Sequence, residues 1–198
     1  MIPLIVLTGP TTSGKSETAL ELARKLNTEI ISADSMQVYK YFDIGTAKNS
    51  ASARQSIPHH LIDILEPEDE FNAFDFKTQA LATIHDLMSR NKIPIVVGGT
   101  ALYLKVLIQD YDCAVEISEE TRKKIQQEIL QQGIEQVYKS LQTIDPAFAE
   151  KISETDSLRI ERALGVYRET GKPFSEFHKE DSATDISFPI HTFIIEWN

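Results

Sequence analysis

Eight residues near the amino end, Gly9–Ser16 with the sequence GPTTSGKS, match the pattern G-x-x-x-x-G-K-[ST] in full. In this pattern the glycines let successive backbone N–H groups turn towards one anion, and the lysine adds a positive charge beside a terminal phosphate. The loop follows the apolar run Ile2–Leu7 and precedes a helical pattern, which is the setting it requires. We therefore predict that a pyrophosphate or nucleotide is bound by Gly9, Pro10, Thr11, Thr12, Ser13, Gly14, Lys15 and Ser16, with the Ser16 hydroxyl as a ligand of Mg²⁺.

Two further polar residues follow strand-like runs and should lie at the same edge of a sheet. Asp34 comes directly after Glu29–Ala33, and Thr100 follows the glycine pair that ends Ile93–Gly99. Asp34 could take a proton from an incoming nucleophile, or it could cap a turn or contact a Mg²⁺-bound water, and the two interpretations are equally good. Thr100 could reach the same cavity, act as a helix N-cap, or do both. The strand before Thr100 ends in glycines where an ordinary NTP hydrolase needs an acid, which favours a transfer enzyme.

The adjacent histidines His59 and His60, with Asp63 nearby, suggest a metal site at first sight. Neighbouring residues on a strand point to opposite faces, so we expect a packed or hydrogen-bonded pair in place of a shared metal.

Strand-like and helical patterns alternate along the first part of the chain. Strands are expected at Ile2–Leu7, Glu29–Ala33, Ile93–Gly99 and, more weakly, Leu61–Leu65, and helices at Lys15–Leu26, Ala73–Met88 and Ala101–Ile108. This alternation predicts an α/β fold with a mostly parallel sheet and right-handed crossovers. The expected architecture is a P-loop nucleoside-triphosphate-hydrolase-like core, a parallel sheet flanked by helices, plus a helical insertion domain.

The insertion begins near Cys113, after which the pattern is helix and turn. One helix should begin after Ser118 and end before Gly133, and a later one should span Asp156–Thr170. We expect the core at residues 1–112 and 187–198, and the helical insertion domain at 113–186, with an exit linker at Glu180–Ser187.

The last strand is expected at Phe193–Trp197, flush with the end of the chain. Ligands of such sheets bind beyond the carboxyl ends of the strands, where a following segment normally contributes, so we expect the chain to be incomplete.

Composition and charge limit the partners. With 41% hydrophobic and 25% charged residues and a single cysteine, the sequence is typical of a soluble, cytoplasmic protein without disulfides or a cysteine-based metal site. No apolar run approaches the length that spans a membrane, and we expect a monomer. The sequence contains 20 Lys and Arg and 30 Asp and Glu, so its net charge is −10. A nucleic acid would therefore have to bind at a local basic surface. The basic residues available are Arg122, Lys123, Lys124, Arg159, Arg162 and Arg168, although each alone fits a solvated helix surface better.

Six motifs, in order and across nearly the whole chain, resemble those of the tRNA dimethylallyltransferases, also called tRNA isopentenyltransferases. They are GPTTSGKS, SADSMQVYK, DIGTAK, PHHLID, GGTALYLK and RIERALGVYRETGKPFS. The resemblance implies transfer of a dimethylallyl group from dimethylallyl pyrophosphate to N6 of the adenosine adjacent to the anticodon. The loop would then hold a leaving pyrophosphate, Mg²⁺ would be the cofactor, and the anticodon stem-loop of tRNA the partner.

The resemblance also implies roles for single residues. Asp34 resembles the base that hydrogen-bonds the adenine amine, and Ser35, Met36 and Gln37 resemble the segment that lines the flipped base. With Lys15 on the pyrophosphate, the expected catalytic residues are Asp34, Thr100 and Lys15. The expected tRNA contacts are Asp34, Ser35, Met36, Gln37, Thr100, Arg122, Leu158, Arg159, Ile160, Glu161 and Arg162.

The chain departs from the family pattern at a few positions. Asn49, Ala101 and Gly165 stand where the family usually has Pro, Gly and Glu, and Leu158 stands where Gln is common. Family chains also continue beyond the last strand. The additional segment has basic residues that help close the pyrophosphate site and helices that bind tRNA. Two alternatives remain open: a small-molecule kinase of the shikimate-kinase type, and a truncated RNA-binding remnant without turnover.

Overall fold

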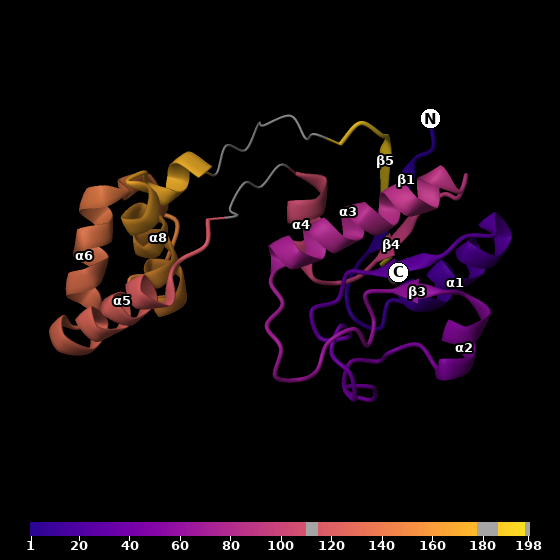
Figure 1. Cartoon of the computed structure of the whole chain (residues 1–198), viewed down its shortest axis with the longest axis horizontal. Coiled ribbons are helices and arrows are strands. Elements are labelled where there is room, and N and C mark those ends of the chain that lie inside the picture. The colour runs from indigo at the N-terminus through magenta and orange to yellow at the C-terminus, as the bar shows by residue number, and fades with distance from the viewer. Residues whose placement is uncertain (110–114, 178–185, 197–198) are drawn as a thin grey trace. The chain divides into compact units, whose positions relative to one another are not determined.

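The computed structural model describes residues 1–109, 115–177 and 186–196 and divides into two compact units (Figure 1). The first unit comprises Met1–Asp110 and Ala183–Asn198, and the second comprises Tyr111–Ser182. The boundary expected near residue 112, the single cysteine and most of the expected linker lie outside the described residues.

A five-stranded sheet forms the centre of the first unit, in the order β3-β2-β4-β1-β5. The strands are β1 (Leu4–Thr8), β2 (Ile30–Ser32), β3 (His59–His60), β4 (Ile95–Val97) and β5 (Ile190–Ile194). Every pairing between these described strands is parallel. Parallel pairing brings the carboxyl ends of β1, β2 and β4 to one edge, which is where the expected polar residues follow.

Helices cover both faces of this sheet. They are α1 (Lys15–Leu26), α2 (Ala51–Ser56), α3 (Ala73–Ser89) and α4 (Ala101–Ile108). Ala19 and Ala23 of α1 pack in one buried cluster with alternate strand residues such as Leu7, Ile30 and Ile95. The other strand residues, among them Leu4, Val6, Ile31 and Val96, are fully buried on the opposite face. Helices α3 and α4 lie on that face and pack on each other (Figure 1).

The second unit is helical throughout its described part. Its elements are α5 (Glu119–Gln132), α6 (Ile134–Ile144), α7 (Pro146–Ala149), α8 (Ser157–Thr170) and a 3₁₀ turn, η1 (Phe174–Phe177). A core is formed by buried side chains on several of these helices, including Ile125, Val137, Leu141, Ile160 and Leu164. The predicted limits of α5 are confirmed: the Ser118 hydroxyl accepts a hydrogen bond from Thr121 N, and Gly133 follows the last residue of the helix. Gly171, in a left-handed conformation, ends α8.

The departure at Gly165 has a packing reason. Gly165 is buried in α8, and a Cβ at this position would lie 2.5 Å from the side chain of Ile117. The missing side chain therefore lets the segment before α5 approach α8 closely.

Two expected strands are corrected. The weak strand predicted at Leu61–Leu65 is wrong: pairing occurs one step earlier, at β3, and Leu61 and Asp63 have positive φ angles of 60° and 54° that turn the chain. The last strand is Ile190–Ile194 and so begins before the expected Phe193, because its register follows β1 from Leu4 to Thr8.

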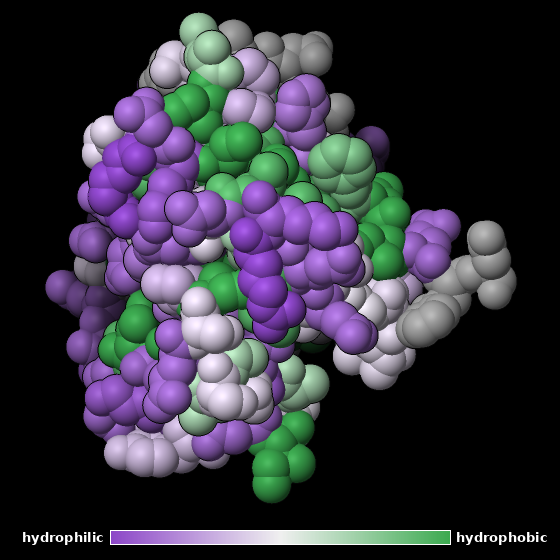
Figure 2. Space-filling model, turned by 90° about the vertical axis from the view of Figure 1, so that its right-hand side faces the viewer, coloured by the Kyte–Doolittle hydropathy of each residue, from purple (hydrophilic) through white to green (hydrophobic). Residues whose placement is uncertain are grey.

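The surface carries both hydrophilic and hydrophobic residues. Figure 2 shows one face, on which hydrophilic residues and patches of hydrophobic residues alternate. Among the described residues, none of the helices combines the length and the apolar character that crossing a membrane would require.

Candidate functional site

The loop between β1 and α1 has a backbone that only particular residues permit. Gly9 has a φ of 144°, and a Cβ there would lie 2.2 Å from the carbonyl oxygen of Ile195. Gly14, with a φ of 87°, turns the chain into α1. Within the described part of the chain, the N–H groups of Gly14, Lys15 and Ser16 have no backbone acceptor. The loop therefore offers donors at a helix start, which is the arrangement that binds phosphate groups.

Lys15 lies over this loop. Its Nζ donates hydrogen bonds to the carbonyl oxygens of Gly9, at 2.8 Å, and Pro10, at 2.5 Å. Burial lowers the pKa of Lys15, and the negative charge of Asp34 acts in the opposite direction. The ammonium is thus placed between the loop and a carboxylate, where an anion would compete with the two carbonyl groups for it.

Asp34 follows β2 and uses one oxygen for the local turn. Its Oδ1 accepts hydrogen bonds from the backbone N–H groups of Met36, at 2.9 Å, and Gln37, at 3.2 Å. The capping interpretation is therefore confirmed for Oδ1. No hydrogen bond to Oδ2 occurs within the described ranges, so the second oxygen is available to a ligand. The role of Asp34 as a base stays a prediction.

Thr100 links two loops at the edge of the sheet. It occupies the N-cap position of α4, but its side chain makes no capping hydrogen bond. Its Oγ1 instead accepts a hydrogen bond from Ser35 N at 3.0 Å and donates one to Ser35 Oγ at 3.4 Å. Thr100 therefore holds the segment that follows Asp34, and its contact with a substrate base stays a prediction.

One pocket in the first unit collects much of the predicted site. The predicted residues that line it are Thr11, Thr12, Lys15, Ser16, Asp34 and Gln37. The residues Thr46, Ala47, Asn49, His59 and Ile62 also line it and were not assigned a role from sequence. The phosphate loop and the Asp34 carboxylate thus lie on one side of the pocket. The other residues named here, Thr46, Ala47, Asn49, His59 and Ile62, form what we call its second wall.

Ion pairs that are partly buried hold the segment of this second wall around Lys48. The Lys48 side chain is 1% exposed, and its Nζ donates to the carbonyl oxygen of Tyr39 at 2.6 Å and to Asp63 Oδ1 at 2.5 Å. Arg54 also pairs with Asp63. Burial would raise the pKa of Asp63, but the hydrogen bonds from Lys48 and Arg54 hold it below its ordinary value. Lys48 ends the motif DIGTAK, which was the only signal for this brace in the sequence.

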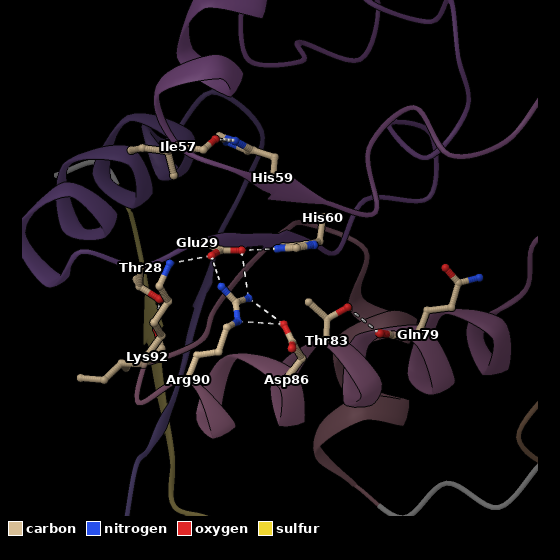
Figure 3. Close-up of polar contacts among 11 residues, drawn as sticks. Thr28, Glu29, Ile57, His59, His60, Gln79, Thr83, Asp86, Arg90 and Lys92 are labelled. Carbon is tan, nitrogen blue, oxygen red and sulfur yellow. Dashed lines mark hydrogen bonds and ion pairs between the residues drawn. The ribbon is translucent and has the colours of Figure 1, made fainter.

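The two histidines point away from each other, as Figure 3 shows. His60 Nε2 contacts Glu29 at 2.8 Å, whereas His59 Nδ1 contacts the carbonyl oxygen of Ile57 at 2.7 Å. Each histidine is therefore hydrogen-bonded, as expected, but to a partner of its own and not to the other histidine. Burial lowers the pKa of His59, and the nearby Arg54 contributes to the same effect.

The donor set fits Mg²⁺ in the presence of phosphate oxygens. The Ser16 hydroxyl and the Asp34 carboxylate line one pocket, and both are the hard oxygen donors that Mg²⁺ prefers. Among the described residues there is no group of three or more His, Cys, Asp or Glu side chains that could enclose a metal ion. A Mg²⁺ ion held by the Ser16 hydroxyl would take further ligands from the phosphate groups of a substrate, as is common for this ion.

The residues expected to contact tRNA in the second unit differ in exposure. Leu158 is 78% exposed, and Arg159, also exposed, pairs with Asp156 at 2.5 Å. Ile160 is fully buried, so its side chain belongs to the core of the unit and not to its surface. Arg122 lies 3.7 Å from the carboxylate of Glu161. Contacts of these residues and of Arg162 with RNA stay predictions.

The glycine loop after the first strand of a parallel sheet, with a carboxylate beside it, defines the chain as a P-loop α/β protein. The chain belongs to the IPP transferase family, whose family model matches residues 37–198. This confirms both the predicted resemblance and the predicted fold class.

The relatives and solved structures agree with this family. The chain is 46% identical over 93% of its length to tRNA dimethylallyltransferase 2 of Geotalea uraniireducens, and 45% identical over 97% to tRNA dimethylallyltransferase of Acetivibrio thermocellus. It spans 59% and 61% of the length of these two relatives.

Two solved structures are also similar. One is a eukaryotic dimethylallyltransferase acting on tRNA, with a TM-score of 0.81 and 34% identity over 98% of this chain and 48% of that one. The other is a tRNA isopentenylpyrophosphate transferase of Bacillus halodurans, with a TM-score of 0.56 and 38% identity over 88% of this chain and 58% of that one.

Proposed function

We propose that the chain carries the active site of a prenyltransferase that moves a dimethylallyl group from dimethylallyl pyrophosphate to N6 of the adenosine adjacent to the anticodon in tRNA. The names of its relatives support this proposal. The observation that carries it is a pocket lined by Lys15, Ser16 and Asp34, in which the predicted pyrophosphate loop lies beside a carboxylate.

The proposed reaction forms one bond to the dimethylallyl group and breaks one, and residues of this chain take up the proton and bind the leaving group. The lone pair of the adenine N6 attacks C1 of the dimethylallyl group, and the C1–O bond breaks with its electron pair leaving on the pyrophosphate. Asp34 Oδ2 accepts the proton that N6 loses and passes it to solvent. Lys15 and the loop N–H groups bind the negative charge that develops on the leaving group.

Mg²⁺ is proposed as the cofactor. When bound, it would neutralise further charge on the departing pyrophosphate. Ser16 would hold it, together with oxygens of the pyrophosphate. We further propose that the chain acts as a monomer in the cytoplasm, a compartment that its single cysteine suits.

An adenine amine is a weak nucleophile, so alignment matters as much as charge. The acceptor base must leave the stack of the anticodon loop to reach the pocket, which has its second wall at Asn49 and His59. In the helical unit, exposed cations such as Arg122 and Arg159 are proposed to bind the RNA backbone.

The test is incubation of the chain with labelled dimethylallyl pyrophosphate, Mg²⁺ and unmodified tRNA. Label should appear in the tRNA and should be absent when the acceptor adenosine is replaced by guanosine. Asp34→Asn should abolish transfer and keep pyrophosphate affinity. Asp86→Asn, a change on the exposed surface of α3, should leave both unchanged.

The outcomes separate the alternatives. Bound tRNA without any transfer would refute turnover by this chain and support an RNA-binding remnant. Transfer of phosphate from ATP to a small alcohol in a parallel assay would support the kinase, which the names of the relatives do not favour.

A further inference from the structure

Asn49 and His59 form a hydrogen-bonded pair in the wall of the pocket that faces the phosphate loop. The Nδ1–H of His59 donates to the carbonyl oxygen of Ile57 at 2.7 Å, which leaves Nε2 as an acceptor. Asn49 Nδ2 lies 2.8 Å from this Nε2 and is the donor. The network therefore assigns both the tautomer of His59 and the direction of the Asn49 amide.

The surroundings of His59 favour its neutral form. Burial lowers the pKa of His59, Arg54 and His60 lower it further, and the contact with the Ile57 carbonyl opposes them. A protonated ring would present two donors, and Nε2–H would then face the N–H of Asn49. The neutral ring is the form that holds the amide in place.

A second amide in the pocket has a different use. Gln37 Nε2 donates to the carbonyl oxygen of Thr46 at 2.9 Å, and Gln37 Oε1 accepts from Ser32 Oγ at 3.2 Å. Both ends of the Gln37 amide thus brace the pocket wall. The Asn49 amide is bound at one N–H only, and no hydrogen bond to its Oδ1 occurs among the described residues.

The groups left on Asn49 match one edge of a purine. One N–H of the Asn49 amide is directed at His59, and Oδ1 and the second N–H remain for a ligand. Such a pair binds adenine through its exocyclic N6–H and the neighbouring ring nitrogen. Asp34, in the same pocket, can accept the other N6–H.

We propose that Asn49 recognises the acceptor adenine through this pair of hydrogen bonds, and that His59 positions the Asn49 amide for it. The inference rests on the proposed function, because it takes an adenine as the occupant of the pocket. It assigns substrate recognition to Asn49, one of the positions at which the chain departs from the family pattern.

The test compares two anticodon stem-loop RNAs, one with the acceptor adenosine and one abasic at that position. Asn49→Ala should weaken binding of the adenosine RNA about ten-fold, the usual scale for a bidentate base contact. It should leave the affinities for the abasic RNA and for pyrophosphate unchanged. Gln79→Ala, an exposed change on α3, is the matched control and should alter none of the three.

Variants of His59 test the positioning role. His59→Ala should lose most of the preference for adenosine, whereas His59→Gln, which retains an acceptor, should restore part of it. The double variant Asn49→Ala with His59→Ala should discriminate no worse than Asn49→Ala alone. Thermal unfolding of each variant checks that the fold is retained.

Three results for Asn49→Ala would each overturn the inference and leave the proposed function in place. They are an equal loss of affinity for both RNAs, a loss of affinity for pyrophosphate, and an undiminished preference for the adenosine RNA. If the unaltered protein itself shows no preference for the adenosine RNA, the proposed function fails, and the inference fails with it.

Discussion

Glu29 joins three elements of the first unit through a buried carboxylate, and its replacement by Gln is the most informative test of stability. The Glu29 side chain is 8% exposed. Arg90 donates to its two oxygens at 2.6 and 3.3 Å, Lys92 at 2.6 Å, and His60 contacts it at 2.8 Å (Figure 3). These contacts tie the start of β2 to the end of α3 and to β3.

The magnitude follows from the pKa of this carboxyl group. The hydrogen bond from Arg90, with those from Lys92 and His60, lowers the pKa of Glu29 from 4.5 to about 2, although burial opposes the change. At 1.36 kcal/mol per pKa unit, this corresponds to at most about 3 kcal/mol of stability. Because Arg90, Lys92 and His60 are themselves about a third exposed, solvent screening reduces the expected loss in Glu29→Gln to about 1.5–2 kcal/mol.

The sign of the pH dependence is also determined. The pKa of Glu29 is depressed in the folded state, so its contribution is fully present above pH 4.5 and is lost as the pH falls towards 2. The difference in stability between the unaltered protein and Glu29→Gln should therefore be constant near neutral pH. It should decrease to about half by pH 3.

The assay is urea unfolding at several pH values, with the midpoint and the slope compared. Glu21→Gln is the control, because Glu21 pairs with Lys25 on an exposed helix surface. This change should alter stability by less than about 0.5 kcal/mol. A loss in Glu29→Gln that matches the control, or one that stays constant down to pH 3, would refute the reasoning.

Three further predictions concern the site and its supports. Lys15→Ala should weaken pyrophosphate binding about ten-fold or more and RNA binding little, as measured by calorimetry, since a charge-assisted contact is lost; equal losses would argue against a role on the leaving group. Gly98→Ala should destabilise the protein by about 1–3 kcal/mol in urea unfolding, because the new Cβ would lie 2.0 Å from the carbonyl oxygen of Ala33. Gly45→Ala, with nothing within 4 Å, should change stability little, and similar losses in both variants would contradict the packing argument. Arg162→Ala should reduce the salt dependence of tRNA affinity by about one unit of log-log slope; an unchanged slope would place Arg162 away from the RNA.

The bounds of helices that are marked by neighbouring residues in the sequence agree closely with the predictions. Helices α1 and α4 have the predicted bounds, because each begins just after glycines and carries its apolar residues within the next few positions. Short strands were harder, because an apolar run does not specify its pairing partner. The chain pairs at His59–His60 and turns at Leu61, where Leu61–Leu65 has the more strand-like composition.

The sequence by itself determined the phosphate loop, the carboxylate after the second strand and the family, because each is carried by residues adjacent in the chain. Tertiary structure alone decided which side chains share the pocket. Asn49 and His59 are ten residues apart, and only the folded chain, braced by the buried Lys48, brings the amide to the imidazole. Likewise, Thr100 and Ser35 are separated by 65 residues, and their hydrogen bond exists because β2 and β4 are neighbours in the sheet. Spacing along a chain predicts local conformation, but hydrogen bonds between distant residues depend on the packing that places them within reach of each other.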